Sequence, residues 1–462
     1  MIGNTLIQLC QMAILARLLS PSDFGLMAMV MAVMAFVHVF TDLGVSNAII
    51  HHQDINQNEL SSLYWLNVCV GFTLMSVLMV GSYPISVLLF NQPKLQPILI
   101  LVSTSVLCIA FGMQLRIMAE KALRFSVVSK IEVIATFCGF LGSLVWALVS
   151  PSVYALVAGI LLTELMKTVL LWLFARNEWL PDLRLNIGEI RRFLKFGSYV
   201  MANNFANSFN LQADVLIAGR LFPAATLGFY SLPRTLSLKV AGVVNPVVSR
   251  VGLPVMAQAQ NDRVFLKNVY LKTMRMTSSV NFPIYLAVAI FAKDIINLLF
   301  GSRWNESAPL LVLLACWGLV RSCGNPVGSL LLAVGRADLS FKWNMVLLLV
   351  IPPSLWCFAE MGIKGLALGQ VIVMLVLMVP AWYFLIKPNC GATASEYFGT
   401  LLVPFICSIP AVMAAAAISQ ILSGTLVRLL IGGALYLLVY VLASFFLNGD
   451  WLKAMYQLVK TD

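Results

Sequence analysis

Asparagine and aspartate side chains recur at helical spacing between residues 203 and 214. Asn203, Asn207, Asn210 and Asp214 fall at positions i, i+4, i+7 and i+11, so they share one face of a helix. A single amide inside an apolar helix usually serves as interhelical glue. Four polar groups that end in a carboxylate are better explained by a wetted central cavity. We therefore expect this stripe to line a polar cavity.

A weaker copy of the stripe lies at the start of the chain. Asn4, Gln8 and Gln11 again share one helical face, and Gln11 corresponds to Asp214 at an offset of 203 residues. The recurrence of polar residues at equivalent positions favours a cavity lining over hydrogen bonding between helices for both stripes.

Three cationic side chains interrupt apolar stretches: Arg234, Lys239 and Arg321. A guanidinium fork matches phosphate or carboxylate oxygens, so these residues suit an anionic ligand. Alternatively, each snorkels to a polar interface. Arg234 lies eight residues into its stretch, where snorkelling is awkward. Arg321, near Trp317, remains open to both interpretations.

His38 and Asp42 lie at i, i+4, and this pair could form a proton relay. The alternative is a structural pair at a helix end, which the sequence Asp42-Leu43-Gly44 favours. With Asp214, these two residues are the candidates for ion coupling. Glu164 and Lys167 lie one turn apart, and we expect them to neutralise each other.

Motifs for cofactor or metal chemistry are absent from the sequence. It contains neither the GxxxxGK[ST] nucleotide loop nor an HExxH motif. His51, His52 and Asp54 lack the spacing of metal ligands, and the nine cysteines form no CxxC pair. We expect no cofactor, no metal and no enzymatic activity.

The composition places these residues in a membrane. Of the 462 residues, 60% are hydrophobic and 11% are charged, with a mean hydropathy of +0.92. Soluble domains carry about 25% charged residues. The net charge of +11 fits basic cytoplasmic loops better than a nucleic-acid partner, which we exclude.

Apolar runs long enough to span a bilayer recur along the whole chain, since about 20 helical residues suffice. The predicted fold is all-α and polytopic with about fourteen spans. They cover approximately 1–19, 24–44, 61–82, 97–117, 128–149, 153–175, 196–217, 226–247, 274–292, 307–333, 341–358, 363–386, 399–421 and 425–447.

Charge distribution predicts the orientation. With the N-terminus in the cytoplasm, 19 of the 30 Lys and Arg residues fall in cytoplasmic segments and seven in the opposite loops. An even number of spans then places both termini in the cytoplasm.

An internal repeat predicts two similar halves. Ile14-Leu15-Ala16-Arg17-Leu18 resembles Ile217-Ala218-Gly219-Arg220-Leu221, and Gly25 matches Gly228 at the same offset of 203. Six spans per repeat give two lobes related by a pseudo-two-fold axis. The predicted segments are a six-helix lobe (1–175), an amphipathic cytoplasmic linker (176–195), a second six-helix lobe (196–386) and a helix pair with a cytoplasmic tail (387–462).

Several motifs resemble a known family of transporters. Ala16-Arg17-Leu18-Leu19-Ser20-Pro21-Ser22-Asp23-Phe24-Gly25 is similar to the opening motif of polysaccharide repeat-unit flippases. Asp42-Leu43-Gly44-Val45-Ser46-Asn47-Ala48-Ile49-Ile50, Asp214-Val215-Leu216-Ile217-Ala218-Gly219-Arg220 and Leu227-Gly228-Phe229-Tyr230-Ser231 match in the same way. The chain resembles Wzx-type proteins of the multidrug/oligosaccharidyl-lipid/polysaccharide exporter superfamily over almost its whole length, most closely the colanic acid exporter branch.

The resemblance implies a function. Such proteins move undecaprenyl-pyrophosphate-linked oligosaccharides between the leaflets of the bacterial inner membrane by alternating access, coupled to an ion gradient. Arg234, Lys239 and Arg321 would then meet the pyrophosphate or acidic sugars, and Arg17 and Arg220 would guide release at the outer end. The implied partners are the lipid-linked oligosaccharide, membrane lipids, and polysaccharide polymerase and export machinery.

One departure and two alternatives accompany this interpretation. The family usually has a basic segment before the first span, so we expect the start of this chain to be truncated or misassigned. A cation-coupled multidrug antiporter of the same superfamily would use acidic cavity residues such as Asp42 and Asp214. A membrane enzyme of glycan assembly would need larger outer loops than the one near residues 291–308.

Overall fold

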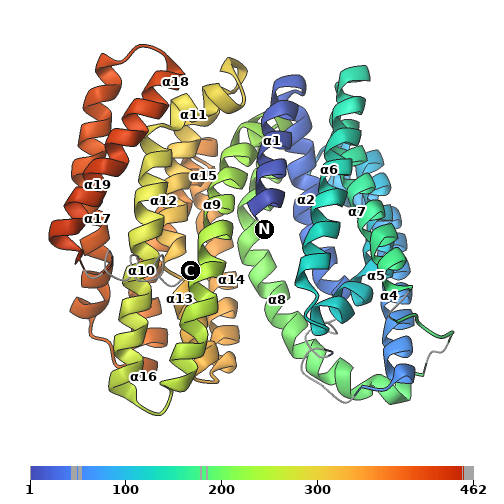
Figure 1. The fold of residues 1–462 in the computed structure, drawn as a ribbon. Helices are drawn as coiled ribbons and strands as arrows, with labels where there is room; N and C mark the ends of the chain where they lie inside the picture. Colours follow the sequence, from blue (N-terminus) through green and yellow to red (C-terminus); the bar gives the residue numbers. More distant parts are fainter. Residues whose placement is uncertain are drawn as a thin grey trace. The chain divides into compact units, whose positions relative to one another are not determined.

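The described part of the protein is built from helices. The computed structural model describes residues 2–42, 49, 55–176, 179–183, 186–449 and 451, and no strand occurs among them. Every predicted span overlaps one or more of the described helices, so the prediction of an all-α fold is confirmed (Figure 1). Helices satisfy every backbone polar group internally, which is what a lipid environment demands.

Apolar side chains cover the outside of these helices. Val80, Val149 and Phe446 are 82%, 83% and 79% exposed, and many other large apolar residues are exposed with them. Within the described residues, ten helices are long and apolar enough to cross a membrane, or eleven if one bent pair counts as a single span. The surface is therefore suited to lipid, and the chain is a multi-pass membrane protein.

The chain divides into two compact units, residues 1–228 with 347–352 and residues 229–346 with 353–462. The predicted division at residues 176–195 stays a prediction. Helices of the first unit are α1 (Ile2–Leu18), α2 (Pro21–Asp42), α4 (Gln57–Pro84), η1 (Ile85–Leu89), α5 (Leu95–Lys121), α6 (Phe125–Val149), α7 (Val153–Ala175), α8 (Ile187–Leu221) and the start of α9 (Ala224–Gln258).

Small residues allow the helices of the first unit to pack closely. A Cβ on Gly71 of α4 would lie 2.5 Å from the Cβ of Ala110 on α5, and a Cβ on Gly139 of α6 would lie 2.6 Å from the carbonyl oxygen of Gly159 on α7. Such close approach is the usual basis of helix association in lipid, where hydrophobic driving force is weak.

Hydrogen bonds attach the segment before α8 to the beginning of α4. The indole N–H of Trp65 donates to the carbonyl of Asp182 at 2.8 Å, and the amide of Asp182 donates to the Ser61 hydroxyl at 3.0 Å. The amide of Asn186 donates to the Ser62 hydroxyl at 3.1 Å. Helix α8 then begins at Ile187 and runs without interruption into the seventh predicted span.

The second unit contains the rest of α9 and the remaining helices. These are α10 (Arg263–Ile290), α11 (Ala292–Leu299), η2 (Ser302–Trp304), α12 (Ser307–Ser322), α13 (Asn325–Ala333), α14 (Ala337–Ala359), α15 (Gly362–Ala381), η3 (Trp382–Ile386), α16 (Lys387–Cys390), α17 (Ala394–Ile421), α18 (Thr425–Val427), η4 (Arg428–Gly432) and α19 (Gly433–Leu447).

Two tyrosines of α19 form hydrogen bonds that attach the last helix pair to α10. Pro283 has no N–H, so the carbonyl of Ser279 one turn earlier loses its helical donor. The hydroxyl of Tyr440 donates to this carbonyl at 2.6 Å, and the hydroxyl of Tyr436 donates to the carbonyl of Pro283 at 2.9 Å. The final helices are thus integral to the packing of the second unit.

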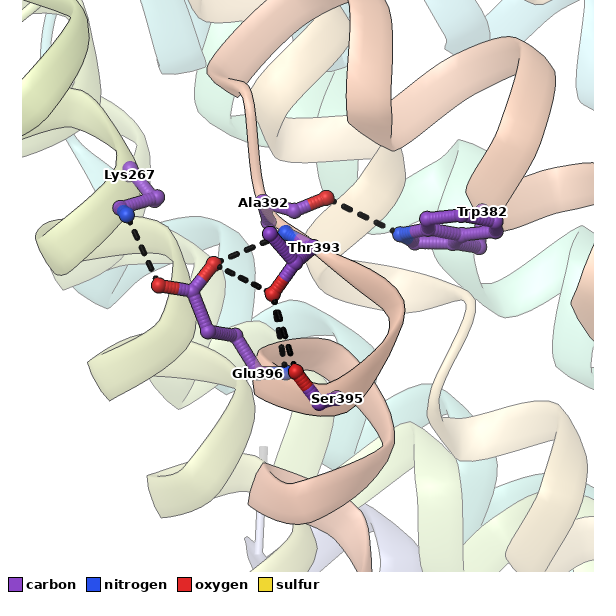
Figure 2. A network of polar contacts seen from close by, with 6 residues as sticks. All are labelled: Lys267, Trp382, Ala392, Thr393, Ser395 and Glu396. Carbon is purple, nitrogen blue, oxygen red and sulfur yellow. Dashed lines mark hydrogen bonds and ion pairs between the residues drawn. The ribbon is translucent and has the colours of Figure 1, made fainter.

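A polar network joins α10 to the beginning of α17 (Figure 2). The ammonium of Lys267 lies 2.8 Å from a carboxylate oxygen of Glu396, whose other oxygen accepts from the amide of Thr393 at 2.8 Å. Thr393 and Glu396 form a capping box, which satisfies the free N–H groups at the start of α17. Lys267 therefore forms an ion pair between α10 and the start of α17, which the capping box already stabilises.

Candidate functional site

The polar stripe of α1 lines a cavity in the first unit. Asn4, Gln8 and Gln11 face a space of about 290 Å³ that is bounded by α1, α2, α5, α6 and α7. The other polar residues that line it are His38, Ser105, Glu132, Thr136, Thr163, Glu164 and Lys167. The α1 stripe thus lines a polar cavity within the first unit, and its predicted part in a central cavity stays a prediction.

Two long hydrogen bonds and one close approach of helices define the walls of this cavity. The amide nitrogen of Gln11 donates to the Ser143 hydroxyl at 3.3 Å, and that of Gln8 donates to the side-chain oxygen of Asn4 at 3.4 Å. A Cβ on Gly159 would lie 3.4 Å from the Gln11 nitrogen and 2.9 Å from the Cβ of Ser143. Glycine at this position lets α7 approach both residues.

Both carboxylates of the cavity have cationic partners. Glu164 and Lys167 lie 2.7 Å apart, which confirms that they neutralise each other. Glu132 lies 3.1 Å from the guanidinium of Arg116, which also binds Glu120 at 2.8 Å. The cavity is consequently polar without a large excess of either charge.

His38 joins this cavity, but the side chain of Asp42 lies outside the described residues. The His38–Asp42 relay therefore stays a prediction. His51, His52 and Asp54 also lie outside the described residues. Among the residues that the structure describes, no cluster of three or more His, Cys, Asp or Glu side chains could hold a metal ion.

The second stripe lies on α8. Asn203 and Asn210 are half-buried, Asn207 is exposed, and Asp214 is 2% exposed. All four residues occupy one continuous helix, as their spacing predicts. Their role in a cavity stays a prediction.

Two of the cationic candidates of the second unit, Arg234 and Arg321, flank the contacts of one tyrosine. The hydroxyl of Tyr285 on α10 donates to the carbonyl of Ser237 on α9 at 2.9 Å, and a Cβ on Gly318 of α12 would lie 2.4 Å from the Tyr285 ring. Arg234 precedes Ser237 by three residues, and Arg321 follows Gly318 by three residues. Each arginine is therefore about one helical turn from the same three-helix contact.

Arg234 is only 7% exposed and is therefore not a surface cation, and Lys239 is half-buried. The guanidinium of Arg321 lies 5.3 Å from the centre of the Trp317 ring. An aromatic face stabilises a cation without neutralising its charge. The sequence did not single out Tyr285, because a tyrosine in an apolar span gives no local sign of its partners.

Arg17 and Arg220 are exposed at the ends of α1 and α8. The guanidinium of Arg220 donates to the carbonyls of Leu88 and Leu89 at 2.9 and 3.5 Å, at the end of η1. A cation there stabilises the free carbonyls of a helix end. Arg220 therefore has a structural contact in addition to the outer-end role predicted for it.

The repeat-related glycines make reciprocal contacts. A Cβ on Gly25 would lie 1.7 Å from the carbonyl oxygen of Ala224, and a Cβ on Gly228 would lie 1.8 Å from that of Pro21. Ala224 corresponds to Pro21 at the offset of 203, just as Gly228 corresponds to Gly25. Equivalent positions of the repeat thus pack against each other where α2 and α9 begin.

These features define a polytopic α-helical membrane protein with a polar cavity among its helices. The model of a family described as "Polysaccharide biosynthesis protein" matches residues 14–309. The lipopolysaccharide biosynthesis protein WzxC of Escherichia coli (strain K12) is 31% identical over 90% of this chain and 85% of its own. The chain belongs to this family of polysaccharide biosynthesis proteins.

Two solved structures share the fold. The lipid II flippase MurJ, in an inward closed conformation, matches 97% of this chain and 98% of its own with a TM-score of 0.78 and 13% identity. A multidrug resistance MATE family transporter of the MOP superfamily, in an inward-facing conformation, matches 89% and 95% with a TM-score of 0.66 and 14% identity. The chain therefore shares the fold of these two proteins.

Proposed function

We propose that the protein is a flippase that moves undecaprenyl-pyrophosphate-linked oligosaccharide repeat units from the cytoplasmic to the periplasmic leaflet of the bacterial inner membrane. Family membership, the name of the WzxC relative and the fold shared with a lipid II flippase support this proposal. The product would serve synthesis of an exopolysaccharide, a capsule or an O-antigen.

The physical problem of flipping explains why such a protein needs polar groups inside the membrane. Sugar hydroxyls and pyrophosphate lose their hydration in hydrocarbon, at a cost of several kcal/mol per unpaired polar group. The lipid tail has no such difficulty and can stay in the bilayer. A polar route through the protein for the head alone is therefore sufficient.

The position of Arg234 is the observation that carries the proposal. It is 7% exposed in α9, and Arg321 of α12 lies within about one turn of the same Tyr285 contact. Two guanidinium groups supplied by different helices suit the oxygens of a pyrophosphate. Lys239 adds a third cation, and Asn203, Asn207, Asn210, Asp214 and Gln11 would supply polar contacts along the route.

The remaining assignments follow the predicted topology. Residues 1–175 and 196–386 would form the two moving lobes, residues 176–195 their cytoplasmic linker, and residues 387–462 an accessory segment. Both termini would lie in the cytoplasm, with Arg17 and Arg220 at the periplasmic end. His38, Asp42 and Asp214 are the candidates for ion coupling, and a polysaccharide polymerase would receive the product.

Leaflet accessibility of the lipid-linked repeat units tests this proposal. The gene is deleted and complemented with the wild type, Arg234→Ala or Arg234→Lys, and spheroplasts are probed with a membrane-impermeant sugar label. We expect the deletion to abolish outer labelling and the wild type to restore it. Arg234→Ala should lower the rate of outer labelling about tenfold or more. Arg234→Lys should give a rate between those of the wild type and Arg234→Ala, because lysine keeps the charge but lacks the bidentate guanidinium group.

Arg336→Ala is the matched control, because Arg336 is a solvent-exposed arginine paired with the equally exposed Asp338 at 3.0 Å. It should label like the wild type at equal protein level in the membrane. Unchanged outer labelling after deletion, in a host without a redundant exporter, would contradict the flippase.

A cation-coupled multidrug antiporter is the second candidate. The buried carboxylate of Asp214 and the fold shared with a MATE transporter favour it. Resistance gained by expression in an efflux-deficient host, and lost with Asp214→Asn, would support the antiporter. Equal drug sensitivity with and without the protein would remove it.

A further inference from the structure

We propose that the polar cavity of the first unit binds an uncharged, hydroxyl-rich sugar ring of the cargo and thereby selects the glycan. This inference rests on the proposed flippase function and assigns one part of the cargo to one site. It separates recognition of the sugar from recognition of the pyrophosphate, which falls to the cations of the second unit.

The lining has the chemistry of a sugar site. Asn4, Gln8 and Gln11 present amides, each of which both donates and accepts hydrogen bonds. Sugar hydroxyls also donate and accept, so an amide can pair with one in either sense. The hydroxyls of Ser105 and Thr136 extend this character to α5 and α6. A cavity for an apolar drug would instead be lined mainly by hydrophobic and aromatic side chains.

The charges of the cavity argue against an ionic ligand. Glu164 is held by Lys167 at 2.7 Å, and Glu132 is held by Arg116 at 3.1 Å. A cation would have to displace Lys167 or Arg116 from its carboxylate, and an anion would have to displace a carboxylate from its cation. A neutral polyol binds without breaking either ion pair, because it needs only hydrogen bonds.

The size and rigidity of the cavity limit what fits. A volume of about 290 Å³ lies just below the range of roughly 300–1,000 Å³ for small-molecule sites. It therefore accommodates a small part of a glycan and not a whole repeat unit. Gln11 is positioned by Ser143, and Gly159 sets the distance between α7 and that pair. A site with fixed donors discriminates between sugars that differ in hydroxyl position.

Binding of two separate probes to the purified full-length protein in nanodiscs tests the proposal. The first probe is the free oligosaccharide released by mild acid from the host's own lipid-linked pool. The second is undecaprenyl pyrophosphate without sugar. The variants are Gln8→Leu and Thr136→Val, which remove polar groups and nearly preserve volume. Thr104→Val is the matched control, because Thr104 of α5 bonds the carbonyl of Leu101 at 2.7 Å and does not line the cavity.

We expect Gln8→Leu and Thr136→Val each to weaken oligosaccharide binding about fivefold, the effect of one neutral hydrogen bond. Neither should change the binding of undecaprenyl pyrophosphate, which Arg234→Ala should weaken. Thr104→Val should match the wild type with both probes. Thermal unfolding of each variant checks its fold, and Thr136→Val remains decisive if Gln8→Leu is unstable.

Equal oligosaccharide binding by the wild type and both cavity variants would overturn the subsite, as would a wild type that does not bind the oligosaccharide. Neither result affects the leaflet assay, so the flippase would stand. Conversely, oligosaccharide binding that depends on Gln8 and Thr136, together with unchanged leaflet labelling after gene deletion, would support a sugar site in a protein that is not a flippase.

Discussion

Gly25 lies directly against the main chain of Ala224, at a distance that no other amino acid allows. A Cβ on Gly25 would lie 1.7 Å from the Ala224 carbonyl oxygen, and the obstacle is backbone, which cannot rotate away. The reciprocal contact of Gly228 with Pro21 repeats the same geometry at equivalent positions. Pro21 begins α2, and Ser20 and Asp23 hold that helix start through a 2.6 Å hydrogen bond.

Gly25→Ala and Gly228→Ala should therefore each destabilise the protein. Overpacking of this kind costs about 1–3 kcal/mol, so the midpoint of thermal unfolding in detergent should fall for both. Gly242→Ala is the control, since a Cβ on Gly242 would meet nothing within 4 Å. It should be neutral or slightly stabilising, because alanine favours a helix over glycine. Unfolding midpoints that are equal for all three variants would rule out the contact.

Tyr440→Phe should cost about 1–3 kcal/mol of the free energy of unfolding, because it leaves the buried Ser279 carbonyl without a donor. Pro283→Ala supplies a new N–H to that carbonyl. A double-mutant cycle should therefore show that Tyr440→Phe costs less when residue 283 is alanine. Additive effects would mean that Tyr440 does not replace the donor that Pro283 lacks. Tyr83→Phe, at an exposed tyrosine of α4, should have little effect.

Ser61→Ala should loosen the segment that precedes α8. The amide of Asp182 loses its acceptor, so its hydrogen exchange should become about fivefold faster, which corresponds to one neutral hydrogen bond. Exchange at α5 should not change, and this serves as the internal control. If the Asp182 amide exchanges at the same rate in the wild type and in Ser61→Ala, the hydrogen bond to α4 does not protect it.

Lys267→Gln should have a small effect. The Lys267 and Glu396 side chains are 26% and 36% exposed, and pairs this open to solvent contribute about 0–1 kcal/mol. Glu396→Ala should cost more than Lys267→Gln, because it also removes the capping box with Thr393. The difference between them should persist in high salt, which screens the ion pair but not the cap. A larger loss for Lys267→Gln would contradict this ranking.

The sequence alone determined the membrane class and the positions of the helices. A bilayer forces the chain to satisfy its backbone polar groups within each segment, so every predicted span overlaps one or more helices, although α8, α9 and α10 extend about ten residues beyond their apolar runs. The stripe of Asn4, Gln8 and Gln11 could be predicted to line a cavity for a similar reason, since a polar face on an apolar helix must meet water or other polar groups.

Only the tertiary structure decided which distant residues share a site. His38, Thr136 and Lys167 come from three helices, and no local pattern links them to the α1 stripe. Tyr285 and Tyr440 find their partners, Ser237 and Ser279, on other helices across separations of 48 and 161 residues. Such contacts depend on how helices pack, and packing is set by shape complementarity summed over many side chains. Periodicity along one helix carries no information about that sum.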